Sequence, residues 1–305
     1  MRQFLRHPST LTALLLLACV GLSACGDETS SAGDRVSIVA TTTQLADFTR
    51  NVVSDRAEVT QLLRPNVDPH DFEPTPSDAT AIAEADLVVE NGIGLDEWLG
   101  DLIDNAGVAP RRIVATDGLA VRPGDEESPD GDPHVWLDPR NAIAMVRAIA
   151  DAMSAADPEG ARVYRANANR YVAEIEGLDI DLQRQIGRIA APDRTIVTDH
   201  DAFGYFTSRY GIRVAGTVIP SLATGAEPAA KDVDALIDTI RREKVRAVFV
   251  EGGLDPALAR SIADEAGATL GEPLYGDSLA EPAEPAGTYL GMMRANMDAI
   301  VTALR

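Results

Sequence analysis

The chain is poor in cysteine and histidine. Its 305 residues include 2 cysteines and 4 histidines. Because Cys19 lies inside an apolar leader, Cys25 would be the single cysteine of the mature chain, and no disulfide could form within it. The fold must therefore rest on its hydrophobic core, for which the remaining length of about 270 residues is sufficient.

Long apolar runs are also lacking, apart from one at the beginning of the chain. Two arginines precede an apolar run at residues 11–22, which is too short to span a bilayer as a stable helix. This layout is typical of a secretory leader and predicts a signal peptide over residues 1–24. The sequence LSACG at residues 22–26 resembles a bacterial lipobox, where the leader is cut before a cysteine that then carries lipid. An ordinary cleavage site beside a chance cysteine is the alternative, but it would export the unpaired thiol of Cys25.

A short polar segment follows this site. Residues 26–34 contain no apolar residue larger than alanine, which predicts a flexible tether over residues 25–35. We therefore expect a protein held at the outer face of the cell membrane by a lipid on Cys25, with its folded part beginning near Arg35.

Basic residues are scarce relative to acidic ones. The chain has 27 lysines and arginines against 48 aspartates and glutamates, and its formal net charge is −21. A surface this acidic repels nucleic acid and anionic lipid and favours cations, although solubility alone would account for most of it. We expect no nucleic-acid partner.

Short β-branched runs alternate with helix-length segments in both halves of the chain. They lie at residues 36–40, 57–63, 86–90 and 111–115, and again at residues 194–198, 212–218, 245–251 and 268–275. Such alternation predicts parallel sheets flanked by helices. The expected fold class is α/β with two lobes, over residues 36–157 and 191–305.

The segment between these lobes has no strand signal. Residues 158–190 carry apolar residues at helical spacing, and Pro192 ends the pattern. A helix of about thirty residues is roughly 45 Å long, which matches two lobes side by side. We expect this single helix to join the lobes rigidly.

The three histidines of the mature chain fall in loops near predicted strand ends. His70 follows the run at residues 57–63 after a short loop, and His200 directly follows the run at residues 194–198. His134 lies at the end of a loop, before a predicted helix. Ligands bind open parallel sheets at the carboxyl ends of the strands. Two carboxylates share such positions, Glu251 at the end of one predicted strand and Asp277 just after another.

The tripeptide Asp-Pro-His occurs at residues 68–70 and again at residues 132–134. Neutral imidazoles combined with a carboxylate are typical of transition-metal sites, whereas magnesium and calcium prefer oxygen ligands. The aromatic residues that follow, Phe72 and Trp136, could shield such a site. Any one of these histidines alone would more simply be a surface or core residue, and Asp277 a turn residue. The absence of mature histidines elsewhere favours a shared site.

Five stretches of sequence together resemble one family. They are DPHDFEPTPSD, DPHVWLDP, DHDAFGYF, VFVE and YGDSL, at residues 68–78, 132–139, 199–206, 248–251 and 275–279. In this order they are similar to the solute-binding lipoproteins of bacterial zinc and manganese ABC importers. The resemblance implies two α/β lobes joined by a backbone helix, with one metal ion between them. It further implies that the ligands are His70, His134, His200 and Asp277.

The third ligand bears on the metal. Manganese-type relatives have a glutamate where this sequence has His200, so the resemblance implies the zinc type, with Mn²⁺ as the alternative. Many zinc-type relatives carry a histidine-rich loop before the second ligand. Here the corresponding loop at residues 121–133 has acids and no further histidine. It could hold metal weakly, but we expect a solvated surface loop.

Two other classes of function stay open at this point. A zinc hydrolase would need a general base, for which Glu251 is available, although the same side chain could simply orient a ligating histidine. The sequence contains no HExxH, GxSxG or Gly-rich phosphate loop. A surface adhesin is the other alternative. We expect a monomer that is not an enzyme and that delivers its metal to membrane permease subunits with their ATPase.

Overall fold

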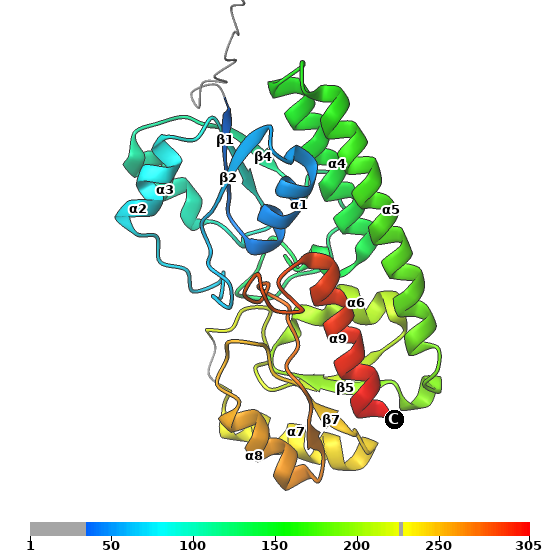
Figure 1. Ribbon diagram of the computed structural model, residues 1–305. Coiled ribbons are helices and arrows are strands. Elements are labelled where there is room, and N and C mark those ends of the chain that lie inside the picture. The colour runs from blue at the N-terminus through cyan, green and yellow to red at the C-terminus, as the bar shows by residue number, and fades with distance from the viewer. Residues whose placement is uncertain (1–34, 226–227) are drawn as a thin grey trace, which may run out of the picture. The chain divides into compact units, whose positions relative to one another are not determined.

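The computed structural model describes residues 35–225 and 228–305 (Figure 1). The predicted leader, the tether and Cys25 lie outside the described residues. Two four-stranded parallel sheets, each flanked by helices, make up residues Arg35–Arg305. The predicted α/β class with two lobes is therefore confirmed.

The first sheet has the strand order β2-β1-β3-β4. Its strands are β1 (Val36–Ala40), β2 (Ala57–Gln61), β3 (Leu87–Glu90) and β4 (Arg111–Val114). Successive side chains of a strand point to opposite faces. Accordingly Ile38 packs with the helices α1 (Thr43–Val53) and α4 (Pro139–Ala156), whereas Val39 packs with α2 (Pro76–Ala83) and α3 (Trp98–Ala106). Both faces are covered, which explains the nearly continuous apolar runs of these strands.

The second sheet has the order β6-β5-β7-β8. Its strands are β5 (Thr195–Thr198), β6 (Arg213–Thr217), β7 (Ala247–Val248) and β8 (Thr269–Leu270). One face packs on α7 (Ala230–Glu243) and α8 (Ala257–Ala266), and the other on α6 (Gly204–Tyr210) and the central core. The last two strands are much shorter than predicted. Beyond them, Glu251 and Leu274 form only an isolated bridge, and Pro273 has no N–H to continue a ladder.

Three long helices pack side by side (Figure 1). They are α4, α5 (Ala161–Ile186) and α9 (Tyr289–Leu304). One of them, α5, runs beside both lobes, with α4 beside the first lobe and α9 beside the second. The predicted linking helix is thus shorter at both ends, with 26 residues and a length of about 39 Å. The Asp157 carboxylate accepts the N–H of Gly160 in the turn before α5, which accounts for the later start. None of the helices in the described residues is long and apolar enough to cross a membrane.

One hydrophobic core extends across both lobes. Ile38 of the first sheet, Phe206 of α6 and Met297 of α9 all belong to it and are fully buried. Removing such a core side chain typically costs about 2–5 kcal/mol of unfolding free energy. The lobes are therefore joined by packed side chains as well as by α5.

Candidate metal centre

The loops at the carboxyl ends of the strands bring the four predicted ligands together. His70 follows β2, His134 precedes the short helix η1 (Val135–Leu137), His200 follows β5, and Asp277 follows β8. One nitrogen or oxygen atom of each lies within 4.8 Å of one from each of the others. Residues 207 positions apart in the chain thus form one cluster between the lobes.

His134 is the most firmly held of these side chains. It is fully buried, and its Nδ1 lies 2.9 Å from Oδ1 of Asp132. The same oxygen accepts the backbone N–H of His134 at 3.0 Å. A carboxylate on Nδ1 fixes the ring orientation and leaves Nε2, which lies 3.1 Å from Asp277, free to bind a metal.

His70 reaches the cluster from the other Asp-Pro-His sequence. Its Nε2 lies 3.3 Å from Nε2 of His134 and 3.7 Å from Oδ2 of Asp277. Its backbone N–H donates to Oδ1 of Asp68 at 2.8 Å. His70 also lines a cavity of about 550 Å³ together with Phe72, Glu127 and other residues, so it is the member of the cluster that faces a route from outside.

His200 and Asp277 are contributed by the second half of the chain. His200 Nε2 lies 3.3 Å from Oδ2 of Asp277, and its Nδ1 lies 3.5 Å from Oδ1 of Asp199. Both side chains are almost fully buried. Each candidate histidine thus has an aspartate within two residues of it in the sequence. This spacing could have pointed to three neighbouring carboxylates, Asp68, Asp132 and Asp199.

Glu251 holds the Asp277 segment. Its Oε1 accepts the backbone N–H of Asp277 at 2.7 Å and also that of Gly276. These bonds go to the backbone beside Asp277, and the role of Glu251 in orienting a ligating histidine stays a prediction. Glu251 nevertheless lies close to His200 and Asp199, within the same 4.8 Å limit.

The electrostatics of the cluster are set by the buried Asp277. Burial opposes ionisation of this carboxyl, but the surrounding imidazoles outweigh that and hold its pKa well below the usual range. Burial likewise opposes the charged form of His134, yet Asp132 and Asp277 raise the pKa of His134 to about 9. The pKa of His200 is raised for the same reason, against burial, by Asp277 and Asp199. Burial instead lowers the pKa of His70. The metal-free cluster therefore holds protons where a cation could bind.

Several buried polar atoms at this centre have no hydrogen-bond partner of good geometry. They are Nδ1 and Nε2 of His200 and both carboxylate oxygens of Asp277. Buried polar atoms without partners are costly, so their convergence needs a compensating group. Zinc bonds to nitrogen and oxygen are about 2.0–2.1 Å, which places the ligand atoms of a tetrahedral ion about 3.3 Å apart. The separations of 3.1 to 3.7 Å given above fit a cation of this kind.

The two aromatic residues near the histidines differ in placement. The Trp136 ring packs edge-on against His134, with 5.6 Å between ring centroids, and is buried. Phe72 packs on Trp98 of α3 and shares the small outer core of the first lobe. Trp136 thus covers one side of the cluster, and Phe72 lines the cavity that His70 borders.

The acidic loop at residues 121–133 is mostly exposed, as expected of a solvated loop, but two of its acids contact the second lobe. Oδ2 of Asp125 accepts the N–H of Leu222 at 2.8 Å. Oε2 of Glu127 accepts the hydroxyl of Ser221 at 2.7 Å. These two carboxylates therefore connect the lobes.

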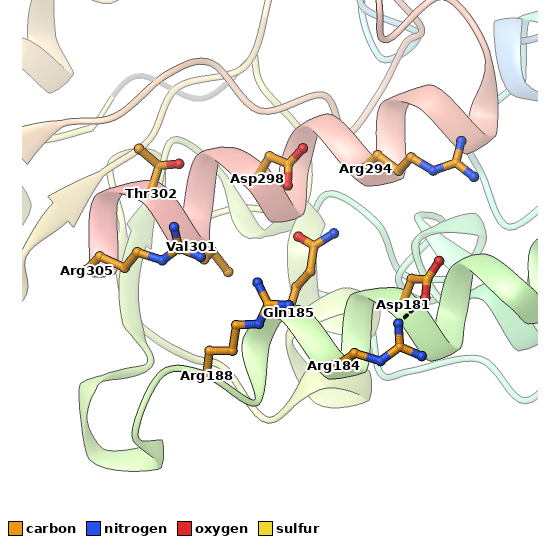
Figure 2. A pocket seen from close by; sticks show the side chains of 9 residues that line it. All are labelled: Asp181, Arg184, Gln185, Arg188, Arg294, Asp298, Val301, Thr302 and Arg305. Atoms are coloured by element: carbon orange, nitrogen blue, oxygen red, sulfur yellow. Dashed lines mark hydrogen bonds and ion pairs between the residues drawn. The ribbon is translucent and has the colours of Figure 1, made fainter.

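A second cavity, of about 630 Å³, lies between α5 and α9 (Figure 2). Charged side chains of both helices line it, and Arg184 pairs with Asp181 at 2.7 Å. Arg184 and Arg188 stand near the carboxyl end of α5, where cations offset the helix dipole. Among the described residues that line it there is no histidine, so it offers no site of the kind described above.

Comparison with known proteins identifies the family of the chain. The family model described as the periplasmic zinc-uptake complex component A matches residues 38–303. The manganese ABC transporter substrate-binding lipoprotein PsaA of Streptococcus pneumoniae is 30% identical over 302 residues, covering 96% of each chain. The manganese-binding lipoprotein MntA of Bacillus subtilis is 32% identical over 307 residues, covering 97% of this chain and 99% of its own.

Solved structures agree in fold. The periplasmic zinc-binding protein TroA of Treponema pallidum superimposes with a TM-score of 0.82 at 28% identity, over 88% of this chain and 99% of its own. A manganese-bound periplasmic metal-binding protein of Candidatus Liberibacter asiaticus gives a TM-score of 0.80 at 27% identity, over 89% of this chain and 100% of its own. Relatives of similar likeness are thus named for different metals.

Proposed function

The chain belongs to the family of the periplasmic zinc-uptake complex component A, and from this premise we propose that it captures one divalent metal ion between its lobes and delivers it to an ABC-type importer. The proposed ligands are His70, His134, His200 and Asp277. The permease subunits with their ATPase would be its partners, as the names of relatives that are transporter components suggest.

One observation carries this proposal. Three imidazoles and one carboxylate meet at a buried point, and four of their polar atoms have no other partner of good geometry. Around them, Asp132 contacts the far side of the His134 ring and Glu251 holds the backbone of Asp277. Support of this kind is typical of metal ligands, which depend on hydrogen-bonded neighbours for orientation and basicity.

We propose Zn²⁺ as the ion. Three nitrogen donors and one carboxylate suit a borderline, tetrahedral cation, and the spacing of the donor atoms suits its bond lengths. TroA, whose fold superimposes on this one, is named as a zinc-binding protein.

Manganese is the second candidate, and one feature of the centre favours it. Oδ1 of Asp277 lies 3.1 Å from His134, while Oδ2 lies 3.3 Å from His200, so both oxygens face the centre. Binding through both would give five donor atoms, more than a tetrahedral ion uses. PsaA and MntA are named for manganese.

Competition between the two metals tests this proposal. The mature chain, purified without added ions, is analysed for bound metals, stripped with a chelator, and titrated with Zn²⁺ and Mn²⁺ against a chelator of known affinity. We expect one ion per chain and tighter binding of Zn²⁺. Tighter binding of Mn²⁺ would replace zinc by manganese, and no stoichiometric binding of either ion would refute the proposal.

Hydrolysis and adhesion have less support. The family and the named relatives are substrate-binding proteins of transporters and not enzymes. The Glu251 carboxylate, which a hydrolase would need as a base, already accepts two backbone N–H groups.

Attachment to the membrane is the remaining part of the proposal. We propose a lipid on Cys25, in keeping with the relatives named lipoproteins. Replacing this cysteine in Cys25→Ser should move the protein from the membrane fraction to the soluble fraction, because a lipid chain and not a transmembrane helix would hold it. A correctly processed variant that stayed with the membranes would contradict this.

A further inference from the structure

We propose that Asp277, although it follows the second sheet in sequence, is held by the first lobe, and that Trp136 and Gln44 position it. The four proposed ligands would then divide into three that stay together and one, His200, that can separate from them. This inference rests on the proposed function, because it concerns how the same centre opens.

The carbonyl of Gly276, next to the ligand, is bound by two side chains of the first lobe. Trp136 Nε1 donates to this oxygen at 2.9 Å and Gln44 Nε2 donates at 3.2 Å. Both donors are buried, at 1% and 0% exposure. Buried hydrogen bonds that lose one partner cost about 1–3 kcal/mol, so this attachment is not easily given up.

The chain on the other side of Asp277 is attached to the first lobe as well. The N–H of Leu279 donates to Oγ1 of Thr43 at 2.8 Å, and its carbonyl accepts the N–H of Asn66 at 3.2 Å. The ligand therefore lies between two points of attachment to the same lobe, one residue before it and two residues after it.

Helix α9, which follows this segment, begins at the first lobe too. The hydroxyl of Tyr289 donates to the carbonyl of Trp136 at 2.8 Å, and the N–H of Tyr289 donates to Asp47 at 3.3 Å. Both bonds hold the start of α9 against first-lobe residues, in α1 and beside His134.

The second lobe holds Asp277 through Glu251, which accepts the N–H groups of Gly276 and Asp277, and it holds the preceding Leu274 through backbone bonds with residues 250 and 252. His200 differs, because the hydrogen bonds of its loop are made within the second lobe. Thr198 donates its hydroxyl to the carbonyl of His200 at 2.9 Å, and the N–H of Asp201 donates to the carbonyl of Ser221 at 2.9 Å. If the lobes separate, His200 moves with the second lobe and Asp277 stays.

The indole N–H of Trp136 reports this attachment directly. The chain has two tryptophans, so Trp98→Phe leaves one indole N–H signal in an NMR spectrum. We expect that signal to be protected from solvent exchange both with Zn²⁺ bound and after its removal by a chelator. Rapid exchange in the metal-free protein alone would show that Asp277 leaves with the second lobe, and would overturn the inference.

Substitutions test the positioning role. Trp136→Phe keeps an aromatic ring but removes the indole N–H donor, and Gln44→Met keeps the volume but removes the amide. Each should weaken Zn²⁺ binding about 10-fold to 100-fold, the range for supporting partners of metal ligands. Trp98→Phe is the matched control, because the indole nitrogen of Trp98 has no partner among the described residues, and its affinity should be unchanged.

Cobalt absorption provides a readout that a general loss of stability would not change. Co²⁺ bound to His200→Ala should still show the bands of a site with three protein ligands, whereas Trp136→Phe or Gln44→Met should alter the bands through Asp277. Unchanged affinity and unchanged bands in both positioning variants would overturn the inference. If the unmodified chain bound no metal, the proposed function would fail, while the indole exchange would still show which lobe holds Gly276.

Discussion

The Asp-Pro-His sequence at residues 132–134 and the one at residues 68–70 begin with the same local structure. In each, a carboxylate oxygen of the aspartate accepts the backbone N–H of the histidine two residues later, at 3.0 and 2.8 Å. This turn is favoured by aspartate itself and by the fixed backbone angle of the proline.

The surroundings of the two tripeptides then differ. Asp132 also contacts the ring of His134 at 2.9 Å. The second oxygen of Asp68 accepts the hydroxyl of Thr224, a residue of the second lobe. One aspartate therefore supports its own histidine, and the other links its loop to the opposite lobe.

The charge of the two histidines differs accordingly. Burial alone would lower both pKa values, but the carboxylates of Asp132 and Asp277 raise the pKa of His134 to about 9. Burial lowers the pKa of His70, which Asp277 only partly offsets. The same tripeptide thus yields two proposed ligands that differ, His134 with a raised pKa and a fixed ring, and His70 with a lowered pKa beside the cavity. Its neighbours in the fold, and not the motif, decide which role each histidine has.

The largest difference between the two loops should appear when each histidine is removed. Loss of a supporting partner can weaken metal binding roughly 100-fold. We expect His134→Ala to weaken Zn²⁺ binding by well over this factor, and His70→Ala to weaken it less than His134→Ala does. The reason is that His134 is the more basic and better oriented donor. Chelator competition on both variants checks the order, and equal losses would show that the two loops contribute alike.

Removing the charge of Asp132 or Asp68 should weaken Zn²⁺ binding less than removing a histidine does. Of the two aspartates, Asp132 should again matter more. Asp132→Asn should weaken Zn²⁺ binding about 10-fold to 100-fold, because it removes the anionic partner of the His134 ring. It should also lower the pKa of His134 in the metal-free protein from about 9 toward its ordinary value. Asp68→Asn is the matched control, since Asp68 contacts the backbone of His70 and not its ring. Chelator competition measures the Zn²⁺ affinity of both variants, and an NMR titration measures the histidine pKa values. If Asp68→Asn weakened binding as much as Asp132→Asn, support of the His134 ring would not explain why the two loops differ.

The pH dependence of binding should show which histidine holds a proton. Zn²⁺ binds neutral imidazole, and the raised pKa of His134 means that the metal must displace a proton from it at pH 7. Affinity should therefore rise by about tenfold or more per pH unit from pH 7 toward pH 9, and should fall on acidification. Ligands with the ordinary histidine pKa of about 6.5 would show no rise above neutral pH. A flat affinity between pH 7 and 9, corrected for the competing chelator, would contradict a protonated His134.

The stability of the metal-free protein should fall as the pH rises above neutral, whereas the affinity for Zn²⁺ should rise. The pKa of His134 is raised on folding, so its protonation stabilises the metal-free fold fully below about pH 6.5, and this contribution is lost as the pH rises through about 9. The pKa of His70 is lowered on folding, because burial disfavours its charged form. Through His70 the fold therefore loses stability as the pH falls below the ordinary histidine pKa of about 6.5. The melting temperature of the metal-free protein should therefore fall from neutral pH to pH 9, and the fall should be smaller in Asp132→Asn.

The architecture was predictable because its signals are local. Strand runs such as residues 36–40, the proline at residue 192 and the strand-end positions of the histidines follow from patterns within a few residues of sequence. The shortened strands β7 and β8 were not predictable, because Val250 and Leu274 are apolar as in a strand, while the backbone there turns to place Glu251 and Asp277 at the centre.

The supporting residues depend on the fold to different degrees. Asp132 and Asp199 lie within two residues of their histidines and could have been found from the sequence. Gln44 and the bond of Trp136 to Gly276 could not, because the two side chains meet Gly276 from 232 and 140 residues away. Contacts over such separations are set by how the lobes pack, and no local pattern encodes them.

The smallest effect should come from the contact between His70's loop and the second lobe. The Thr224 hydroxyl donates to Asp68, and Thr224→Val removes the donor while keeping the shape of the side chain. Loss of such a bond costs about 1 kcal/mol, which corresponds to about a fivefold faster release of Zn²⁺ if the bond helps to keep the lobes together around the ion. Thr239→Val is the matched control, because the hydroxyl of Thr239 makes an exposed bond within helix α7, to the carbonyl of Ala235. Stopped-flow release into excess chelator measures both variants. A rate unchanged by Thr224→Val would mean that the loop at residues 68–70 holds its ligand without help from the second lobe, and the two Asp-Pro-His sequences would then differ only in the support of the histidine ring.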